Sequence, residues 1–219
     1  MAKKEKKERV TMWIGPGRFS YPFFSEVDEG REFSDSAYKT DLFITKETFK
    51  EKGKGWQDKV KAVGAEAFGS AYKLTSDKYR SPFKDTDTDD DIENESLKNS
   101  IMVRAKAKPR KDKPAVQPLF IGPKKDSNGQ PIKLTDEEIA AIKGGDWGMI
   151  NVTVFSYDKG NGKGVSLGLN AVQFWKKGEA LGQGRAKLLE SMEELADDID
   201  EPTDDAEVEV ENDEDDDII

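Results

Sequence analysis

The sequence predicts a mainly β domain with interposed helices, followed by a disordered acidic tail. Two observations carry this prediction. Several short runs rich in β-branched and aromatic residues alternate with turn residues such as Gly, Pro, Asn and Asp, which is typical of strands. Residues 190–219 contain seventeen Asp or Glu and no Lys or Arg. A segment so charged cannot bury enough apolar surface to fold by itself.

The acidic tail hides a basic body. The 219 residues include 35 Lys or Arg and 45 Asp or Glu, which gives a formal net charge of −10. Without residues 190–219 the same 35 basic residues face 28 acidic ones, so residues 1–189 carry a net charge of +7. A basic body points to a polyanionic partner, above all nucleic acid.

Composition excludes several other classes of function. The chain has no cysteine and no histidine, so disulfides, zinc–thiolate sites, cysteine nucleophiles and imidazole bases are absent. The apolar content of 35% and the mean hydropathy of −0.80 predict one modest core. The charged opening MAKKEKKERV lacks a following apolar segment, and no run approaches the length of a membrane span. A soluble, intracellular protein is expected.

The N-terminal part is expected to supply a basic arm and two strands. The arm covers residues 1–9, and VTMWI then leads to a turn-rich GPG at residues 15–17. RFSYPFF follows as an aromatic strand, which Pro22 places at a sheet edge or at a bulge. AYKTDLFIT, from residue 37, predicts a second strand with Tyr38, Leu42 and Ile44 on one face and Lys39, Asp41 and Phe43 on the other.

A helix and an acidic loop are predicted next. Apolar residues recur at steps of three and four from Trp56 to Leu74, which indicates an amphipathic helix that covers a sheet. The following DTDTDDDIENE, residues 85–95, carries seven acids and no base, so a solvated loop is expected.

The remaining residues predict further strands. IMVRAKAK, residues 101–108, places Ile101, Val103, Ala105 and Ala107 on a core face and Met102, Arg104, Lys106 and Lys108 on a cationic face. A basic, proline-broken loop precedes a short strand at residues 119–121. Thr135 and Glu138 form a capping box for a brief helix through Ile142. Two β-rich runs around DKGNGK predict a hairpin at residues 149–175, and a short closing helix is possible at residues 188–195. About five strands with helices between them indicate a small barrel of the OB type over residues 10–189.

A cationic sheet face beside many aromatics favours single-stranded nucleic acid, because Lys and Arg follow phosphates while rings stack on bases. An ordinary solvated edge strand explains the lysines as well, and most aromatics in any domain belong to the core. Trp147 and Tyr157 stand out because they lie at the ends of a hairpin strand. The candidate DNA contacts are Tyr38, Lys39, Arg104, Lys106, Lys108, Arg110, Lys111, Trp147, Tyr157, Lys159 and Lys163.

Other motifs fail on spacing, and no cofactor or metal site is expected. Asp90 stands where a calcium-binding EF-hand loop starting at Asp85 requires Gly, and Ser96 stands at its twelfth position. GNGKG, residues 160–164, lacks the spacing of a phosphate-binding loop. Two alternatives stay open. One is a metal-dependent nuclease or recombination factor that uses the acids of residues 85–91, and the other is an acidic-tailed interaction protein that does not bind DNA.

AYKTDLFI, the hairpin ending in GLNAVQFW and the acidic terminus together resemble bacteriophage single-stranded DNA-binding proteins of the replication type, over most of residues 18–185. The resemblance implies a non-enzymatic OB-fold protein that binds single-stranded DNA with little sequence preference in phage replication and recombination. It also implies the cytoplasm of an infected bacterium, no membrane contact and a possible homodimer.

The resemblance gives the tail a role besides solubility. It implies that the acidic end recruits replication or recombination proteins, and a cationic body offers the tail an internal target that nucleic acid would compete for. The recruiting residues would be Asp213, Glu214, Asp215, Asp216, Asp217, Ile218 and Ile219. Related proteins often end in an aromatic residue, so the two isoleucines are a departure.

Overall fold

The computed structural model describes residues 9–29, 36–90, 92, 94–109, 114–159 and 162–181. All of them belong to Met1–Gly182, the first of two units into which the chain divides. The predicted acidic tail and closing helix lie outside the described residues. The described elements are β1 (Thr11–Asp28), β2 (Ala37–Thr45), α1 (Lys46–Phe68), β3 (Phe83–Asp85), β4 (Ser100–Ala107), β5 (Leu119–Lys125), β6 (Pro131–Lys133), α2 (Asp136–Ala140), β7 (Trp147–Lys159) and β8 (Gly162–Lys176), with short 3₁₀ turns at Gly69–Ala71, Thr86–Thr88 and Glu95–Leu97.

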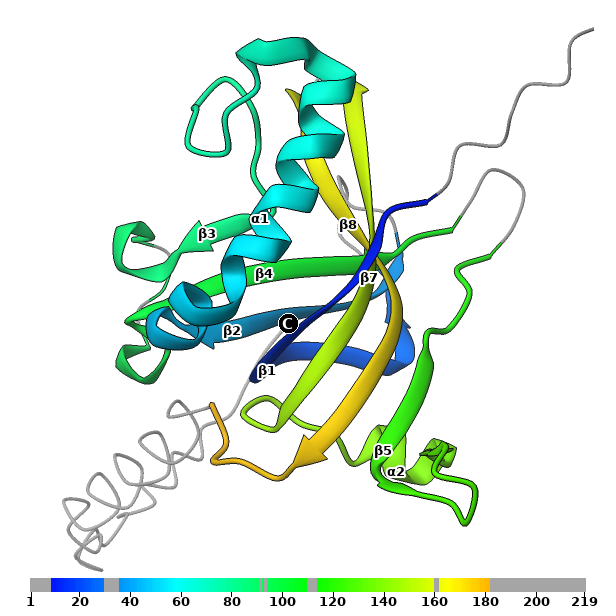
Figure 1. The fold of residues 1–219 in the computed structure, drawn as a ribbon. Helices are drawn as coiled ribbons and strands as arrows, with labels where there is room; N and C mark the ends of the chain where they lie inside the picture. Colours follow the sequence, from blue (N-terminus) through cyan, green and yellow to red (C-terminus); the bar gives the residue numbers. More distant parts are fainter. Residues whose placement is uncertain are drawn as a thin grey trace, which may run out of the picture. The chain divides into compact units, whose positions relative to one another are not determined.

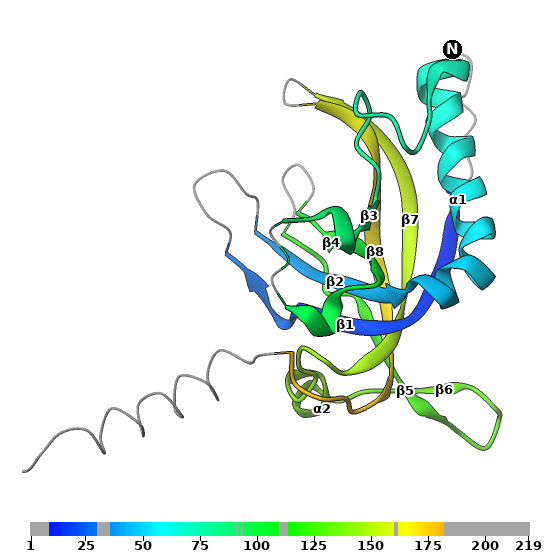
Figure 2. The same ribbon diagram turned by 90° about the vertical axis from the view of Figure 1, so that its left-hand side faces the viewer.

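Five of the strands close a barrel (Figures 1 and 2). The ring runs β1–β2–β4–β8–β7 and returns to β1. Four of these pairings are antiparallel, and β4 with β8 is parallel. The ring can close because β1 is long: its first part pairs with β7 and its second part pairs with β2. The predicted five-stranded OB barrel is confirmed, and β5 and β6 extend the sheet from β8.

β1 is one bent strand that includes TMWI and GPG, whereas the expected strand began only after the GPG turn. Its pairing with β7 shifts register between Ile14 and Gly17, so GPG forms an irregularity inside the strand. Pro22 lies in a second irregularity, between Ser20 and Phe23. The predicted bulge is therefore confirmed, and the prediction of an edge position holds locally, because the pairing of β1 with β7 ends at Arg18 and β2 is the described strand that pairs with β1 around Pro22. A proline is tolerated where the ladder is interrupted, since it donates no hydrogen bond.

Inward-pointing residues of the barrel strands form the main core with one face of α1. Ile14, Leu42, Val103, Ile150, Val152 and Val172 are fully buried, and Trp56 and Val60 of α1 pack against them. The predicted helix is confirmed, but its ends differ. It begins at Lys46 rather than Trp56, because the Thr45 hydroxyl accepts a hydrogen bond from the Thr48 N–H at 3.2 Å. It ends at Phe68 because Gly69, at φ +76°, leaves the helical conformation.

The acidic segment is not simply a solvated loop. Asp85 ends β3, and both Asp85 and Asp87 form ion pairs with Lys46, at 2.7 and 2.6 Å. Asp89 is buried and pairs with Lys84 at 2.5 Å. Lys46 is distant in sequence and Lys84 lies just before the segment, so the composition of residues 85–95 by itself predicted only a loop. The segment holds β3 and its 3₁₀ turn against the barrel.

The other predicted elements are confirmed with small changes. β4, the β7–β8 hairpin and the Thr135–Glu138 capping box of α2 are present, while β6 was not expected. Met102 and Phe43 were placed on the polar face, yet both are buried in a second small cluster with Leu97. The 3₁₀ turn Glu95–Leu97 supplies Leu97 to that cluster. Neither α-helix in the described ranges has the length and apolar content needed to cross a membrane.

Candidate nucleic-acid interface

Strand register places one row of residues around the outside of the barrel. Lys39 of β2 lies opposite Lys106 of β4, and Lys106 lies opposite Gly168 of β8. Gly168 lies opposite Thr153 of β7, which in turn lies opposite Thr11 of β1. Paired residues on neighbouring strands share a face of the sheet. The row therefore has a cationic half on β2 and β4 and an uncharged half on β8, β7 and β1.

The cationic half, taken with the neighbouring outward residues on and just after β4, contains four of the predicted DNA contacts: Lys39, Arg104, Lys106 and Lys108. Arg104 forms a two-pronged ion pair with Asp41, with Nε–Oδ1 and Nη2–Oδ2 both at 2.7 Å. Lys39 forms an ion pair with Asp28, and its Nζ lies 4.9 Å from the centre of the Phe23 ring. Arg104 and Lys39 thus share their charge with carboxylates of the protein.

Lys106 lies in the middle of this half. Burial lowers its pKa, and the nearby charges of Arg104, Lys39 and Lys108 lower the pKa further. Asp41 acts in the opposite direction. A crowd of like charges favours an anion beside it, because the anion would relieve their repulsion. The predicted cationic face is therefore present, and its centre is suited to a phosphate.

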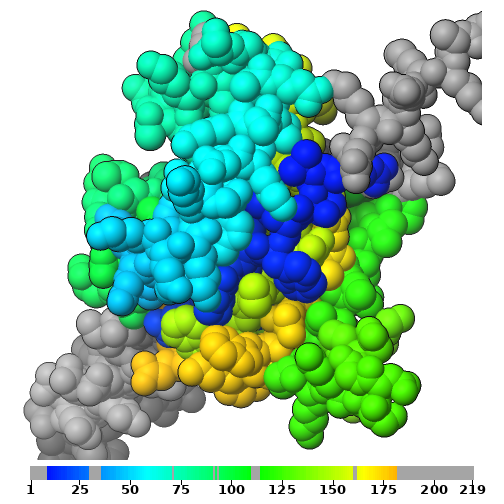
Figure 3. Space-filling model, in the orientation of Figure 1, coloured from blue at the N-terminus to red at the C-terminus, as the bar shows by residue number. Residues whose placement is uncertain are grey.

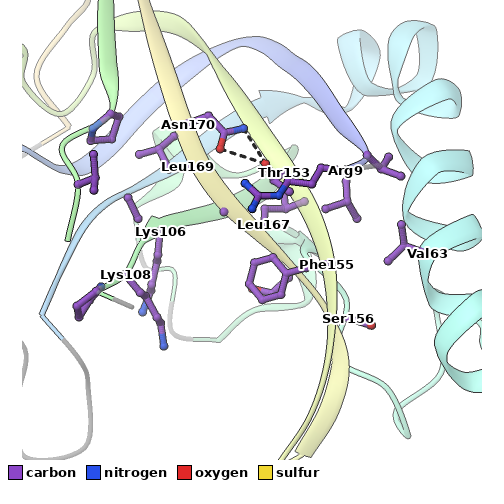
Figure 4. A pocket seen from close by; sticks show the side chains of 18 of the residues that line it. Arg9, Val63, Lys106, Lys108, Thr153, Phe155, Ser156, Leu167, Leu169 and Asn170 are labelled. Atoms are coloured by element: carbon purple, nitrogen blue, oxygen red, sulfur yellow. Dashed lines mark hydrogen bonds between the residues drawn. The ribbon is translucent and has the colours of Figure 1, made fainter. Parts of the chain in front are cut away.

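Lys106 and Lys108 form one side of a groove of about 1010 Å³ (Figure 4). Its floor is formed by β7 and β8, α1 borders it with Val63, Glu66 and Ala67, and a proline-rich segment after β4 forms another wall. In the space-filling view, α1 and β1 lie side by side over the barrel (Figure 3). The Lys59 ammonium joins them by donating to the Thr11 carbonyl at 3.0 Å.

Phe155 projects into this groove from the floor (Figure 4). Its side chain is 43% exposed, although most large apolar residues of β7 and β8 are buried. The sequence analysis missed this residue. The signal was available, because Val152 and Val154 in the middle of this strand are the apolar residues that a core would bury, and strict alternation then places Phe155 outside.

The β7 and β8 side chains of the floor next to Phe155 are polar and uncharged, and Arg9, which precedes β1, lines the same groove beside Thr153 (Figure 4). The Asn170 amide donates to Asn151 and to the Thr153 hydroxyl, both at 3.0 Å. Trp13, 38% exposed, lies opposite Asn151 on β1 beside a smaller hollow of about 490 Å³. In a chain with 37% charged residues, an outward face built from such groups is unusual. It suits the uncharged faces of nucleobases better than phosphates.

The predicted residues Tyr157, Lys159 and Lys163 lie at the far end of the β7–β8 hairpin. The Lys163 ammonium lies 5.4 Å from the centre of the Tyr79 ring. Burial raises the pKa of Tyr72, and Tyr157 raises it further, which places Tyr157 beside the cluster of Phe68, Tyr72 and Tyr79. The hairpin end is braced there, since the Arg80 N–H donates to the Lys163 carbonyl at 2.9 Å.

The structure does not gather the remaining predicted residues into the groove. Trp147 starts β7, ten residues before Tyr157, which is roughly 30 Å along a strand. The Lys176 ammonium covers it at 5.6 Å from the ring centre and also lies 5.7 Å from Trp175. Tyr38 is half-buried opposite Ala107. Arg110, Lys111 and the tail residues 213–219 lie outside the described residues.

Comparison with known proteins decides the family. The model of the Enterobacter phage Enc34 ssDNA-binding protein family matches residues 10–206. The chain belongs to this family. No curated protein matches it.

Solved structures of the Enc34 protein have the same fold as this family member. The single-stranded DNA-binding protein from bacteriophage Enc34 in complex with ssDNA is 19% identical, with a TM-score of 0.62 over 82% of this chain and 97% of that one. A second structure of the single-stranded DNA-binding protein from bacteriophage Enc34 has 19% identity and a TM-score of 0.59 over 87% of this chain and 97% of that one. Its C-terminal truncation has 19% identity and a TM-score of 0.60 over 82% and 96%.

Proposed function

We propose that this phage protein binds single-stranded DNA across the outside of its barrel. Lys106 and Lys108 hold phosphates at one side of the groove, and a base stacks on Phe155. The observation that carries the proposal is the exposed Phe155 ring among uncharged β7 and β8 residues, bordered by these two lysines and by Arg9. Membership of the family of phage ssDNA-binding proteins supports the same ligand.

The groove is suited to a strand of any sequence. Stacking on a ring contributes roughly 1–3 kcal/mol per base and tolerates every base, because each base has a π face. Reading a base edge would require free hydrogen-bonding groups. The Asn170 amide nitrogen, a polar group on the floor, is already engaged by Asn151 and Thr153.

We infer a binding role rather than a catalytic one. The nuclease alternative depended on carboxylates of residues 85–91, and Asp85, Asp87 and Asp89 each pair with a lysine of the fold. The Lys46 hydrogen bond lowers the pKa of Asp87, and the Asn99 N–H lowers it further. These contacts give the acids a structural role. Labelled single strands incubated with magnesium or manganese should therefore stay intact.

We further propose that residues 190–219 regulate access to the groove and recruit replication or recombination proteins. The seventeen tethered negative charges would compete with DNA for the cationic half of the row. The terminal residues Asp213–Asp217, Ile218 and Ile219 would contact the partner. Charge complementarity with the basic body supports the competition.

The test is a titration of labelled oligo-dT with the full chain at several salt concentrations. Affinity should fall with salt at a log–log slope of about 0.7 for each phosphate contacted. Phe155→Ala should weaken binding roughly tenfold, within the range for one stacked base, and leave that slope unchanged because the ring is neutral. Ile132→Ala, an exposed apolar residue of β6, is the control. A flat salt response, or wild-type affinity of Phe155→Ala, would contradict this mode of binding.

A further inference from the structure

We propose that Tyr21 is a second base-stacking residue, which a bulge in β1 displays at the opposite border of the cationic half from Phe155. The proposal rests on the proposed function, since it concerns the same single-stranded ligand. It adds a contact on β1, so that the track of the bound strand runs from Phe155 over the lysines to Tyr21.

The side chain of Tyr21 is 76% exposed, compared with 43% for Phe155 and 38% for Trp13. An apolar ring stabilises a fold in proportion to the area that it removes from water. Tyr21 buries little area, so its ring contributes little to folding. A large, exposed ring of this kind is suited to cover another molecule.

The backbone of Tyr21 points to the same conclusion. Its φ is +45°, in the left-handed region that bulky residues rarely adopt. Among the described residues, one other non-glycine residue has a positive φ, and it is Asn99, a residue type that tolerates this conformation. A glycine would adopt the angle without strain. Tyr21 therefore costs the fold conformational energy, while its 76% exposure leaves it little packing against the described residues, a combination found at functional positions.

The bulge places Tyr21 at the border of the cationic half. It lies between the pairs Ser20–Asp41 and Phe23–Lys39, so Tyr21 and Pro22 are extra residues opposite Thr40 of β2. The second half of β1 runs beside β2 (Figure 2). The Lys39 ammonium lies over the Phe23 ring, and Tyr21 is the most exposed ring at this border among the residues that the structure describes.

Strand order gives the extent of the track. From β7, which carries Phe155, the sheet passes through β8, β4 and β2 to the bulge of β1. Four spacings of about 4.8 Å make roughly 19 Å along the sheet. Lys106 and Lys39 lie on the two strands before the bulge. A single strand laid over these lysines has a ring available on either side.

The experiment compares Tyr21→Gly, Tyr21→Phe and the wild-type full chain for oligo-dT affinity, salt slope and thermal unfolding. Tyr21→Gly should weaken binding tenfold or more, because stacking on one base is lost. Its salt slope should stay unchanged, since no charge is removed. Its Tm should be unchanged or higher, because glycine relieves the backbone strain. Tyr21→Phe should bind like the wild type, and Ile132→Ala again serves as the exposed apolar control.

The outcomes separate this proposal from the proposed function. Wild-type affinity of Tyr21→Gly would overturn the role of Tyr21, while the groove remains supported if Phe155→Ala still weakens binding. A lower Tm of Tyr21→Gly would overturn it too, because the ring would then be part of the packing. Equal loss in Tyr21→Phe would assign the effect to the hydroxyl instead of stacking. Failure of the wild type to bind oligo-dT would instead contradict the proposed function.

Discussion

The missing side chain of Gly168 shapes the floor of the groove as much as the ring of Phe155 does. Gly168 lies between Lys106 and Thr153 in the row around the barrel, so bare backbone separates the lysine from the uncharged half. A glycine inside a strand often marks the close approach of a ligand. Its space lies directly beside the exposed Phe155 ring.

Gly168→Val should therefore weaken DNA binding without unfolding the protein. A Cβ at Gly168 would lie 3.6 Å from Phe155 Cε1 and 3.7 Å from the Thr153 carbonyl oxygen, which are ordinary contacts. Valine favours strands, so the free energy of unfolding should stay the same or rise by up to about 1 kcal/mol. Its methyl groups cover the space beside the ring, and oligo-dT affinity should fall roughly tenfold, a loss at the lower end of that for one stacked base.

Gly168→Ala is the graded control for this prediction. Its single methyl group should produce a smaller loss of affinity than valine does. If valine binds oligo-dT as tightly as the wild type in the same titration, the bare backbone at Gly168 is not part of the contact surface.

At the scale of the element, α1 serves both the core and the groove. Trp56 and Val60 pack into the main core, while Val63 and Ala67 border the groove. The helix is fixed at its C-terminal part by Tyr72, whose ring lies against Gly64. A Cβ at Gly64 would lie 2.2 Å from Tyr72 Cε1, whereas a Cβ at Gly55 would have no neighbour within 4 Å.

These two glycines of one helix predict opposite effects of the same substitution. Gly55→Ala should stabilise the protein by about 1 kcal/mol, because alanine is the better helix former. Gly64→Ala gains the same propensity but forces Tyr72 out of the cluster with Phe68 and Tyr79, and overpacking of this kind costs about 1–3 kcal/mol. The net effect should be destabilising. Urea unfolding of both variants measures the difference, and a gain of stability in Gly64→Ala would show that Tyr72 is free to move.

At the scale of the whole molecule, the sign of the net charge depends on the tail. Residues 1–189 carry +7 and the full chain carries −10. A tethered segment acts at a high effective concentration, so even weak attraction to the basic body can compete with DNA. The acidic pI of the whole chain, about 4.8, is therefore a poor guide to the ligand of the body.

Removal of residues 190–219 should tighten oligo-dT binding, because it removes seventeen negative charges that compete for the lysines. The gain should be largest at low salt, where charges are least screened. Titration of the truncated and full chains at two salt concentrations measures it. A variant with the seventeen acids replaced by Asn and Gln keeps the tail length and serves as the control. Equal affinities of the truncated and full chains would show that the tail does not compete.

Local patterns alone determined much of this fold. The alternation of β4, the turn residues inside the β7–β8 hairpin and the capping box of α2 each depend on residues close in sequence, so the sequence predicted them directly. The cationic face that contains Lys106 was also predictable, because a period of two places its lysines together. The boundaries of α1 were not, since a cap at Thr45 extends it beyond its apolar stripe.

Only the tertiary structure decided how these parts meet. The pairing of β4 with β8 places Lys106 beside Gly168, although 62 positions separate them in the chain. The same fold exposes Phe155 in a groove, leaves Trp147 at the other end of its strand and pairs Asp85 and Asp87 with the distant Lys46. Whether a ring packs or is displayed, and whether a charge is paired, depends on neighbours brought together by folding. Spacing along a sequence carries no record of those neighbours.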